Sequence, residues 1–375
     1  MVHRGKPEKQ AHEAGRVDLL RLSSYFFVDA HALPRTSART VGPHPHTAKM
    51  ATSFTKLAGI RYPIIQAPIG SATTPMLAAA VSNAGALGTL SITWRPIDKV
   101  RQVISDTSAL TTCPFAVNVV LAWPQERRVA LALEAGARLV WTFWGDPTPH
   151  VAQVHTAGGY LMHSVGSVDE AVAVTAAGVD VIVAQGVEAG GHVRGTTPWR
   201  ILLDGILKKL PDLPVLVAGG IADARDVAEA LATGAAGACL GTRFLCCTEA
   251  NVAPVYQERI LHASFGDTVL TNLFDKGWPN APHRVLRNST VRMWEAAGCP
   301  GPGQRPGERD QVGVQPDGTP IERYSDVIPT VDLQGDLEAL ALYAGQSSER
   351  ISDVLPAEDI VAQLVRSLPS RFNST

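Results

Sequence analysis

The sequence predicts an α/β fold, a (β/α)8 TIM barrel with a smaller, mainly helical second lobe inserted after the eighth strand. Short apolar runs alternate with alanine-rich stretches of helical period, which is typical of parallel strands covered by helices. The length of 375 residues also suits a barrel of about 250 residues with an added lobe.

Eight short apolar runs rich in β-branched residues are expected to form the barrel strands. They span residues 63–67, 86–91, 114–119, 138–143, 160–165, 179–185, 214–218 and 237–240. The segments between them, such as 74–84 and 223–233, have the spacing of amphipathic helices. An open doubly wound sheet is the alternative, but it predicts a GxGxxG motif after the first strand, and residues 65–70 read Ile-Gln-Ala-Pro-Ile-Gly. The eight units therefore favour a closed barrel.

The regular alternation of predicted strands and helices covers only part of the chain and divides it into four parts. Residues 1–50 mix charges, histidines and prolines without sustained periodicity, and we expect a disordered tail, an over-extended start or a targeting segment there. Residues 51–245 are expected to form the barrel. Residues 246–335 are expected to form a cap over its mouth, with a Pro/Gly-rich loop at 298–320. Residues 336–375 supply C-terminal helices, at 337–344 and 357–368, that pack back on the barrel.

Composition and charge exclude several classes of protein. With 45% apolar and 18% charged residues, the chain can bury a large core. A formal net charge of -2 gives no basic field for nucleic acid, and the apolar stretches fall short of the roughly 20 residues that a membrane span needs. The cysteines form no CxxC pair, and the histidines lack metal-ligand spacing. We therefore expect reduced thiols, no metal and a cytoplasmic protein, unless residues 1–50 direct it to an organelle.

Two glycine-rich loops follow the seventh and eighth strands, where barrels commonly bind phosphate. Gly219 and Gly220 allow the backbone to approach a ligand closely, and the helix that starts near Asp223 offers free N–H groups. Gly241 and Thr242 add a glycine and a hydroxyl after the eighth strand. Glycines also form turns and helix caps, and Asp223 itself is expected to be only a helix N-cap. Together, the two loops predict a phosphate site.

A third loop, residues 185–195 after the sixth strand, is rich in glycine and contains a histidine. A lone histidine is more often structural than catalytic, but the strand end and the flanking glycines favour a functional role for His192. Its imidazole can donate a hydrogen bond or take a proton near neutral pH. Glu188 is expected to fix the loop rather than to act as an acid. His163, at the end of the fifth strand, is a weaker candidate for the same site.

Several of these segments together resemble the nitronate monooxygenase family, formerly called 2-nitropropane dioxygenases. The segments are Gln-Ala-Pro at 66–68, Ser-Asn-Ala-Gly-Ala-Leu-Gly at 82–88, Pro-Phe-Ala-Val-Asn-Val at 114–119, the loop at 185–195, the turn at 218–222, Gly-Thr-Arg-Phe at 241–244 and Tyr-Ala-Gly-Gln-Ser at 343–347. The resemblance covers roughly residues 55–370. It is specific for FMN-dependent barrels and less specific for the reaction.

The resemblance implies FMN as the cofactor, lying across the barrel mouth. The residues that it implies as cofactor ligands are Asn118, Gln185, Gly190, Gly219, Gly220, Cys239, Leu240, Gly241 and Thr242. Within this set, the three glycines at 219, 220 and 241 and the hydroxyl of Thr242 hold the phosphate. Cys239 and Leu240 add backbone contacts beside it, and Gly190 lets its loop lie against the cofactor. The two amide side chains contact the flavin.

The implied reaction is the FMN-dependent oxidation of an alkyl nitronate by O2 to a carbonyl compound and nitrite. His192 matches the catalytic histidine of the family, which deprotonates a neutral nitroalkane or hydrogen-bonds the nitronate. The implied partners are thus a small-molecule substrate and O2, without nucleic acid or membrane. The oligomeric state is left open.

Two departures from the family pattern leave the substrate open. Ile69 stands where a flavin-packing methionine is common. Trp144, at the end of the fourth strand, is bulkier than the family leads us to expect, and it either reshapes the pocket or packs structurally.

Other activities also fit the scaffold. It resembles flavin-dependent NAD(P)H:quinone reductases and FMN-type enoyl-acyl-carrier-protein reductases, which consume a nicotinamide cofactor. From another class, a non-redox phosphate-binding barrel, an isomerase or aldolase, remains an alternative.

Overall fold

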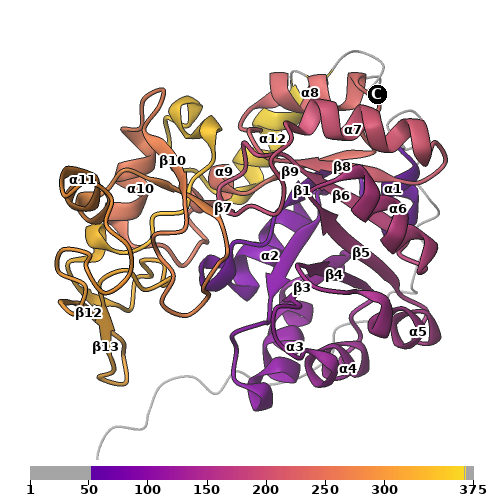
Figure 1. The fold of residues 1–375 in the computed structure, drawn as a ribbon. Helices are drawn as coiled ribbons and strands as arrows, with labels where there is room; N and C mark the ends of the chain where they lie inside the picture. Colours follow the sequence, from indigo (N-terminus) through magenta and orange to yellow (C-terminus); the bar gives the residue numbers. More distant parts are fainter. Residues whose placement is uncertain (1–51, 367, 369–375) are drawn as a thin grey trace, which may run out of the picture. The chain divides into compact units, whose positions relative to one another are not determined.

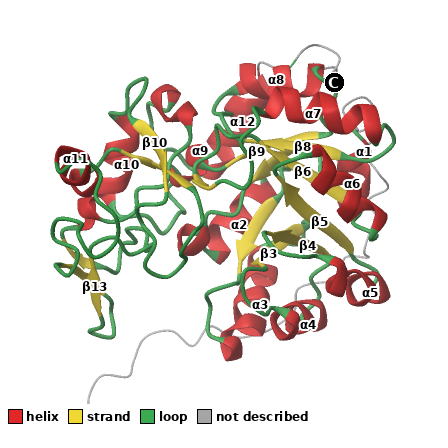
Figure 2. Cartoon of the chain, viewed as in Figure 1, coloured by secondary structure: helices red, strands yellow, loops and turns green. Residues whose placement is uncertain are grey.

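The computed structural model describes residues 52–366 and Leu368, so the expectations for residues 1–50 fall outside the described residues. Eight parallel strands form the sheet that the sequence predicts (Figures 1 and 2). They are β1 (Ile64–Gln66), β2 (Gly88–Ser91), β3 (Phe115–Val120), β4 (Leu139–Phe143), β5 (Tyr160–Val165), β6 (Val181–Gln185), β8 (Val215–Ala218) and β9 (Gly237–Leu240). Each strand overlaps the apolar run that was expected to form it.

The strands curl into a nearly closed barrel. Their order is β1-β9-β8-β6-β5-β4-β3-β2, and every neighbouring pair is parallel. The two end strands meet through a parallel bridge between Ile65 and Leu87, where the Leu87 N–H donates to the Ile64 carbonyl at 2.9 Å. The predicted (β/α)8 barrel is therefore confirmed, and its strand ends converge on one mouth.

Helices cover the outside of the barrel. They are α2 (Pro75–Asn83), α3 (Val100–Leu110), α4 (Glu126–Glu134), α5 (Thr148–Thr156), α6 (Val168–Ala176), α7 (Trp199–Lys209), α8 (Ala224–Ala232) and α12 (Ala357–Arg366). The expected C-terminal helix at 357–368 corresponds to α12, which packs against α2 and α8. A continuous apolar layer lies between these helices and the strands.

The amino-terminal ends of the strands are covered by α1 (Ser53–Ala58). Phe54 of this helix is fully buried and belongs to the apolar cluster inside the barrel, together with Leu139 and Ala236. Thr52 anchors the helix, because its hydroxyl donates to the Ala236 carbonyl at 2.6 Å and accepts from the Thr55 N–H at 3.1 Å. The opposite end of the barrel is therefore the one left for a ligand.

The second lobe contains both helices and strands. Its elements are α10 (Pro254–Leu261), β10 (Thr268–Thr271), β11 (His283–Leu286), α11 (Ser289–Ala296), β12 (Gln311–Val314), β13 (Pro320–Glu322) and β14 (Gln334–Gly335), which run from orange to yellow in Figure 1. The expected mainly helical character of the lobe is thus not confirmed. Its strands form two small antiparallel sheets.

The segment 337–344 differs from its prediction. Only Leu337–Ala339 is helical, as one 3-10 turn. The following residues are extended, because the Leu286 N–H donates to the Leu342 carbonyl and Tyr343 bridges Val285. Pairing with β11 has overridden the local preference for helix in this largely buried run.

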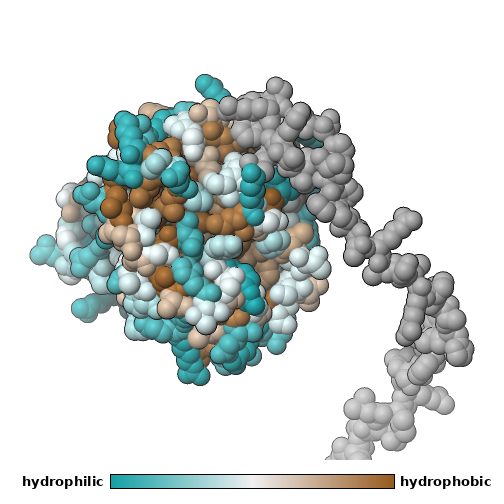
Figure 3. All heavy atoms as spheres, turned by 90° about the vertical axis from the view of Figure 1, so that its right-hand side faces the viewer, coloured by the Kyte–Doolittle hydropathy of each residue, from teal (hydrophilic) through white to brown (hydrophobic). Residues whose placement is uncertain are grey.

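The loop after β6 connects the barrel to the lobe. It contains β7 (Gly191–His192), which pairs antiparallel with β11 and places His192 opposite His283. Polar and apolar residues intermingle on the face of the molecule drawn in Figure 3. Within the described ranges, no helix is both long and apolar enough to cross a membrane.

Candidate active site

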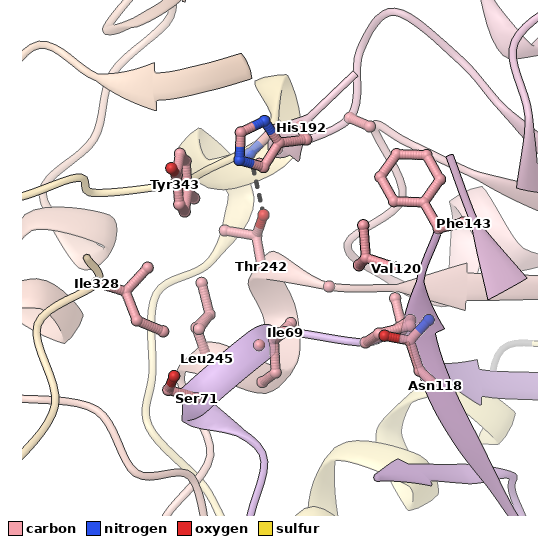
Figure 4. Close-up of a pocket in the computed structure, with 18 of the residues that line it drawn as sticks. Ile69, Ser71, Asn118, Val120, Phe143, His192, Thr242, Leu245, Ile328 and Tyr343 are labelled. Atoms are coloured by element: carbon pink, nitrogen blue, oxygen red, sulfur yellow. Dashed lines mark hydrogen bonds between the residues drawn. The ribbon is translucent and has the colours of Figure 1, made fainter. Parts of the chain in front are cut away.

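A pocket of about 600 Å³ opens at the carboxyl ends of the barrel strands. Its floor and one wall come from the strand ends, and another wall includes Trp278. Ile328 and Tyr343 lie on the same side of the pocket (Figure 4). This volume lies in the range of cofactor and ligand pockets in proteins.

The structure brings nine of the ten predicted site residues into this pocket. They are Asn118, Gln185, Gly190, His192, Gly219, Gly220, Cys239, Gly241 and Thr242. The tenth, Leu240, is fully buried in the layer between strands and helices, and its carbonyl accepts from the Ala67 N–H at 2.9 Å. Leu240 therefore supports the pocket wall and is not one of the lining residues.

The turn after β8 requires glycine. Gly219 and Gly220 have φ values of 106° and 70°, which side chains rarely tolerate, and a Cβ on Gly219 would lie 2.9 Å from the Ala189 nitrogen. Arg350 fixes the turn from outside, because its guanidinium donates to the Gly220 carbonyl at 2.8 Å and to Asp226 Oδ1 at 2.7 Å. The conformation of this turn is thus fixed by its two glycines and by the hydrogen bonds of Arg350.

The start of α8 offers fewer free N–H groups than the sequence predicts, because side chains cap part of its first turn. Asp223 caps α8 as expected, and it forms a capping box with Asp226. The Asp226 carboxylate accepts from the Ala222 N–H at 2.8 Å, and the Asp223 carboxylate accepts from the Asp226 N–H at 3.0 Å. These two amides are occupied, and the glycine turn supplies further backbone groups to an anion at this end of the pocket.

The turn after β9 presents a surface free of side chains. A Cβ built on Gly241 would meet only Ala67 and Ile69, both at 3.8 Å, and would otherwise point into the pocket. The neighbouring Thr242 hydroxyl accepts from the Gly345 N–H at 3.0 Å, the bond drawn in Figure 4. This hydroxyl keeps its own hydrogen for a ligand. The phosphate end of a flavin nucleotide fits such a cradle, which a methyl group would fill.

His192 lies in a box of aromatic rings. The Trp278 ring centroid is 4.0 Å from the imidazole, and His283 and Tyr343 follow at 5.4 and 5.5 Å. Burial lowers the pKa of His192 to about 3, and the nearby His283 adds to this shift. The imidazole is therefore neutral at physiological pH. Its Nδ1 is buried and has no hydrogen-bond partner among the described residues, which is the kind of group that a bound ligand satisfies.

The backbone around His192 is fixed by Gln185. The Gln185 amide donates to the His192 carbonyl at 2.9 Å and accepts from the Arg194 N–H at 3.0 Å. Gln185 therefore shapes this loop, and its contact with the flavin stays a prediction. Asn118, on β3, donates to the Trp141 carbonyl at 3.0 Å and is almost fully buried at the pocket floor.

His283 is held in one neutral tautomer. Its Nδ1 donates to the Ala281 carbonyl at 2.9 Å, and its Nε2 accepts from the Phe274 N–H at 3.2 Å. Burial also lowers the pKa of His283. Since both ring nitrogens are occupied, His283 packs beside His192 and does not exchange protons with it.

Three residues weighed from the sequence prove to be structural. The Glu188 carboxylate accepts from the Trp199 N–H at 3.2 Å and pins its loop, as expected. His163 is fully buried, shares a 2.8 Å hydrogen bond with the Thr142 hydroxyl and does not line the pocket. Trp144, with a φ of 61°, stacks edge-on against Trp278 at 5.0 Å and also stays outside the lining.

Other lining residues could not be found from the sequence. Trp278 and Asp326 lie on irregular lobe segments, where no periodicity marks one position above another. Trp94 lies on the loop after β2 and is half exposed at the mouth. The sequence pointed to Tyr343 only through the segment 343–347, which is one of those that resemble the nitronate monooxygenase family. Trp141 faces the barrel interior from β4, and its indole N–H donates to the Ser164 hydroxyl at 2.8 Å.

Comparison with known proteins decides the family. The family model described as nitronate monooxygenase matches residues 51–127 and 121–367. The chain belongs to the nitronate monooxygenase family. It is an enzyme, an FMN-dependent oxidoreductase that acts on a small molecule, as members of this family are.

Individual relatives agree with this assignment. A nitronate monooxygenase of Paraburkholderia phytofirmans is 33% identical over 359 residues, which cover 83% of this chain and 93% of that protein. Among solved structures, FabK from Thermotoga maritima has a TM-score of 0.73 at 32% identity and covers 86% of this chain and 96% of its own. A nitroalkane oxidase from Streptomyces ansochromogenes has a TM-score of 0.68 at 27% identity, with coverage of 86% and 99%.

Proposed function

We propose that the protein oxidises alkyl nitronates with O2 to a carbonyl compound and nitrite, and that His192 forms the nitronate when a neutral nitroalkane binds. The observation that supports this reaction is the position of the His192 imidazole in the pocket, where its Nδ1 is buried without a partner among the described residues. An uncharged imidazole has a free lone pair and can accept the acidic α-proton of a nitroalkane.

Different pocket residues would bind the phosphate and the flavin ring of the cofactor. Gly219, Gly220, Gly241 and Thr242 would hold the phosphate through backbone groups and one hydroxyl. Asn118 and Gln185 offer amides to the flavin ring, while Gly190 and Cys239 present a surface without bulk. Bound FMN supplies the electron acceptor that later returns electrons to O2, and the protein contributes binding and orientation.

The proton transfer requires a base that is close, desolvated and oriented. His192 is oriented by the Gln185 amide on its backbone and by the Trp278 ring at 4.0 Å. When the α-carbon of a nitroalkane gives its proton to the imidazole, the product pair is an imidazolium and a nitronate. The two charges attract one another beside the buried imidazole more strongly than they would in water, which stabilises the pair.

Substitution of the histidine tests this role. His192→Asn should lower the oxidation of a neutral nitroalkane by about 10²–10⁴-fold, the usual contribution of a general base. The same variant should keep much of the wild-type rate on preformed nitronate, because that substrate has already lost its proton. FMN should stay bound, since the glycine turns do not involve the imidazole.

Two other outcomes would assign the residue differently. An equal loss on both substrates would mean that His192 positions or stabilises the substrate and is not a base. An unchanged rate on both would mean that the histidine is structural and that the proposed reaction centre is misplaced.

A reductase that consumes NAD(P)H is the second candidate, because the higher TM-score, 0.73, belongs to FabK. Anaerobic mixing separates the two activities. A nitronate oxidase should be bleached by nitronate and not by NAD(P)H, and a reductase should show the reverse. A protein that purified without yellow colour would instead favour the non-redox barrel.

A further inference from the structure

A cluster of aromatic rings joins the barrel to the lobe beside His192. Trp123 lies on the loop after β3 and Trp144 on the turn after β4, so both belong to the barrel, whereas Trp278 comes from the lobe. The centroid of the Trp278 ring is 5.0 Å from the centroid of each barrel tryptophan, at interplanar angles of 60° and 67°. Aromatic rings prefer such edge-to-face contacts. Trp278 is therefore seated against two rings of the barrel.

Ring contacts are what hold Trp278 in place. The residue is almost fully buried, but the segment 277–280 belongs to no helix or strand. Within the described ranges, this segment makes no backbone–backbone hydrogen bond, and the Trp278 indole N–H has no hydrogen-bond partner. The same ring lies 4.0 Å from the His192 imidazole, measured between centroids. The position of a ring that touches His192 thus depends on its aromatic neighbours.

Trp144 has a backbone conformation that is unusual for a large side chain. Its φ of 61° lies in the left-handed region, where a bulky residue is strained. Gly145 follows with a φ of 66°, and a Cβ on it would lie 2.6 Å from the Leu121 carbonyl oxygen. The chain therefore turns tightly against the loop after β3. Strain of this kind persists only where the surrounding contacts maintain it, and it is concentrated at functional sites.

Trp144 lies outside the pocket lining, but it contacts the residues on both sides of His192. One is Trp278, and the other is Arg194, whose guanidinium carbon lies 5.3 Å from the centroid of the Trp144 ring. Arg194 follows His192 by two residues, and its N–H donates to Gln185 Oε1 at 3.0 Å. The Trp144 ring itself is 6.3 Å from the imidazole. Any effect of Trp144 on a ligand must pass through these neighbours.

We propose that Trp144 is a positioning residue for His192, because its ring holds Trp278 against the imidazole and the strained turn places the ring there. The proposal rests on the proposed function, in which this imidazole is the base. A base accepts a proton efficiently only when it is held close to the reacting atom, and a displacement of about 1 Å can lower the rate by about 10²-fold. Without the Trp144 ring, Trp278 loses one of its two barrel contacts, and the imidazole loses a fixed neighbour.

Two substitutions separate positioning from stability. Trp144→Ala and Trp144→Gly both remove the ring, but a φ of 61° suits glycine and strains alanine, so the glycine variant should melt at the higher temperature. If the ring positions His192, both variants should lose the same factor, about tenfold or more, in kcat on a neutral nitroalkane. Trp144→Phe, which keeps a ring, should recover part of that rate. A role in stability alone predicts instead that the loss follows the melting temperature.

The histidine signals in an NMR spectrum report the position of Trp278 without turnover. Protons of an imidazole stacked on an indole ring are shifted upfield, so the ring signals of His192 sense the contact at 4.0 Å. The protein has 11 histidines, and the spectrum of His192→Asn identifies the signals of this one. In the holoprotein, Trp144→Gly should move them downfield, and Trp144→Phe should move them less. Flavin affinity should stay unchanged, because Trp144 does not line the pocket.

A double variant tests whether Trp144 acts through the imidazole. In the His192→Asn background, Trp144→Gly should cause no further loss on the neutral nitroalkane, since residues that act through one another are not additive. Trp294→Phe is the matched control. Its indole is a partly buried ring of the lobe that donates to the Pro300 carbonyl at 2.9 Å, and it belongs to a different apolar cluster from Trp278. This control should keep the wild-type His192 signals and the wild-type rate.

Wild-type His192 signals in Trp144→Gly would overturn the proposal, as would activity losses that follow the melting temperatures or add up in the double variant. If neither small variant folded, unchanged signals in Trp144→Phe together with an unchanged rate would also overturn it. Signals that shift as expected in a protein without nitronate oxidation would support the positioning of His192 by Trp144 and refute the proposed reaction. The two failures are thus distinguishable.

Discussion

At the scale of single residues, two glycines of the pocket are constrained by different neighbours. A Cβ on Gly190 would lie 2.4 Å from the Gly345 nitrogen, so this glycine allows two backbone segments to touch. A Cβ on Gly241 would meet Ala67 and Ile69 only at 3.8 Å, an ordinary contact distance. The first position is thus required by the fold, and the second is required only if a ligand occupies the pocket.

This contrast separates folding from cofactor binding. We expect Gly241→Ala to melt at the wild-type temperature as the apoprotein but to bind FMN at least about tenfold more weakly, a loss of about 1.4 kcal/mol. Gly190→Ala should lose about 1–3 kcal/mol of stability by overpacking, with or without flavin. Thermal melts and flavin titrations measure both. Wild-type FMN affinity in Gly241→Ala would place the phosphate elsewhere.

The residues that could be predicted from the sequence share one property. Asn118 lies near the end of β3, Gln185 ends β6 and His192 lies on the loop after β6, so barrel geometry places them at the mouth. Trp278 and Asp326 belong to irregular backbone, and only the folded lobe brings them to the same pocket. Sequence reasoning located the lining residues at and after the strand ends, including His192, and it missed those of the lobe for this reason.

At the scale of elements, the barrel was predictable and the segments that follow it were less so. The strands are continuous apolar runs between helices of clear period, a pattern that few other folds produce. The run at 340–344 is equally apolar, but its conformation depends on pairing with β11, a long-range contact that local preference does not reveal. The lobe strands are short, between two and four residues, and so give no reliable alternation.

The link between the C-terminal segment and the glycine turn can be tested at Arg350. Arg350→Gln should weaken FMN binding several-fold and cost about 1 kcal/mol of stability, because the Gly220 carbonyl and Asp226 lose their donor. The side chain of Arg350 is 38% exposed, so solvent reduces the cost.

Arg200 supplies a matched control for this variant. It pairs with Glu229 at 2.6 Å on the surface and is not one of the residues that line the pocket. Arg200→Gln should leave flavin affinity unchanged and alter stability by less than about 1 kcal/mol. If Arg350→Gln and Arg200→Gln changed flavin affinity and stability equally, Arg350 would have no specific effect on the glycine turn.

At the scale of the whole molecule, barrel, lobe and pocket are assembled within the described residues 52–366 and 368. Thr52 caps the first described helix and anchors it to the Ala236 carbonyl. We expect a chain that starts at Met50 to fold, to melt at the same temperature and to retain a full complement of flavin. Size-exclusion chromatography and the flavin-to-protein absorbance ratio check this. Insolubility or loss of colour would show that residues 1–49 belong to the fold.

The pairing of β7 with β11 has a consequence for how such an enzyme diversifies. The proposed cofactor site belongs to the barrel, but the imidazole is carried on a strand that pairs with the lobe strand β11. Selection for a new substrate can therefore act on lobe sequences while the inherited cofactor chemistry stays constant. The same arrangement limits that freedom, since a deletion that removed β11 would displace the base together with the old specificity. Grafting experiments between relatives should accordingly exchange the lobe and the loop at 185–195 as one unit.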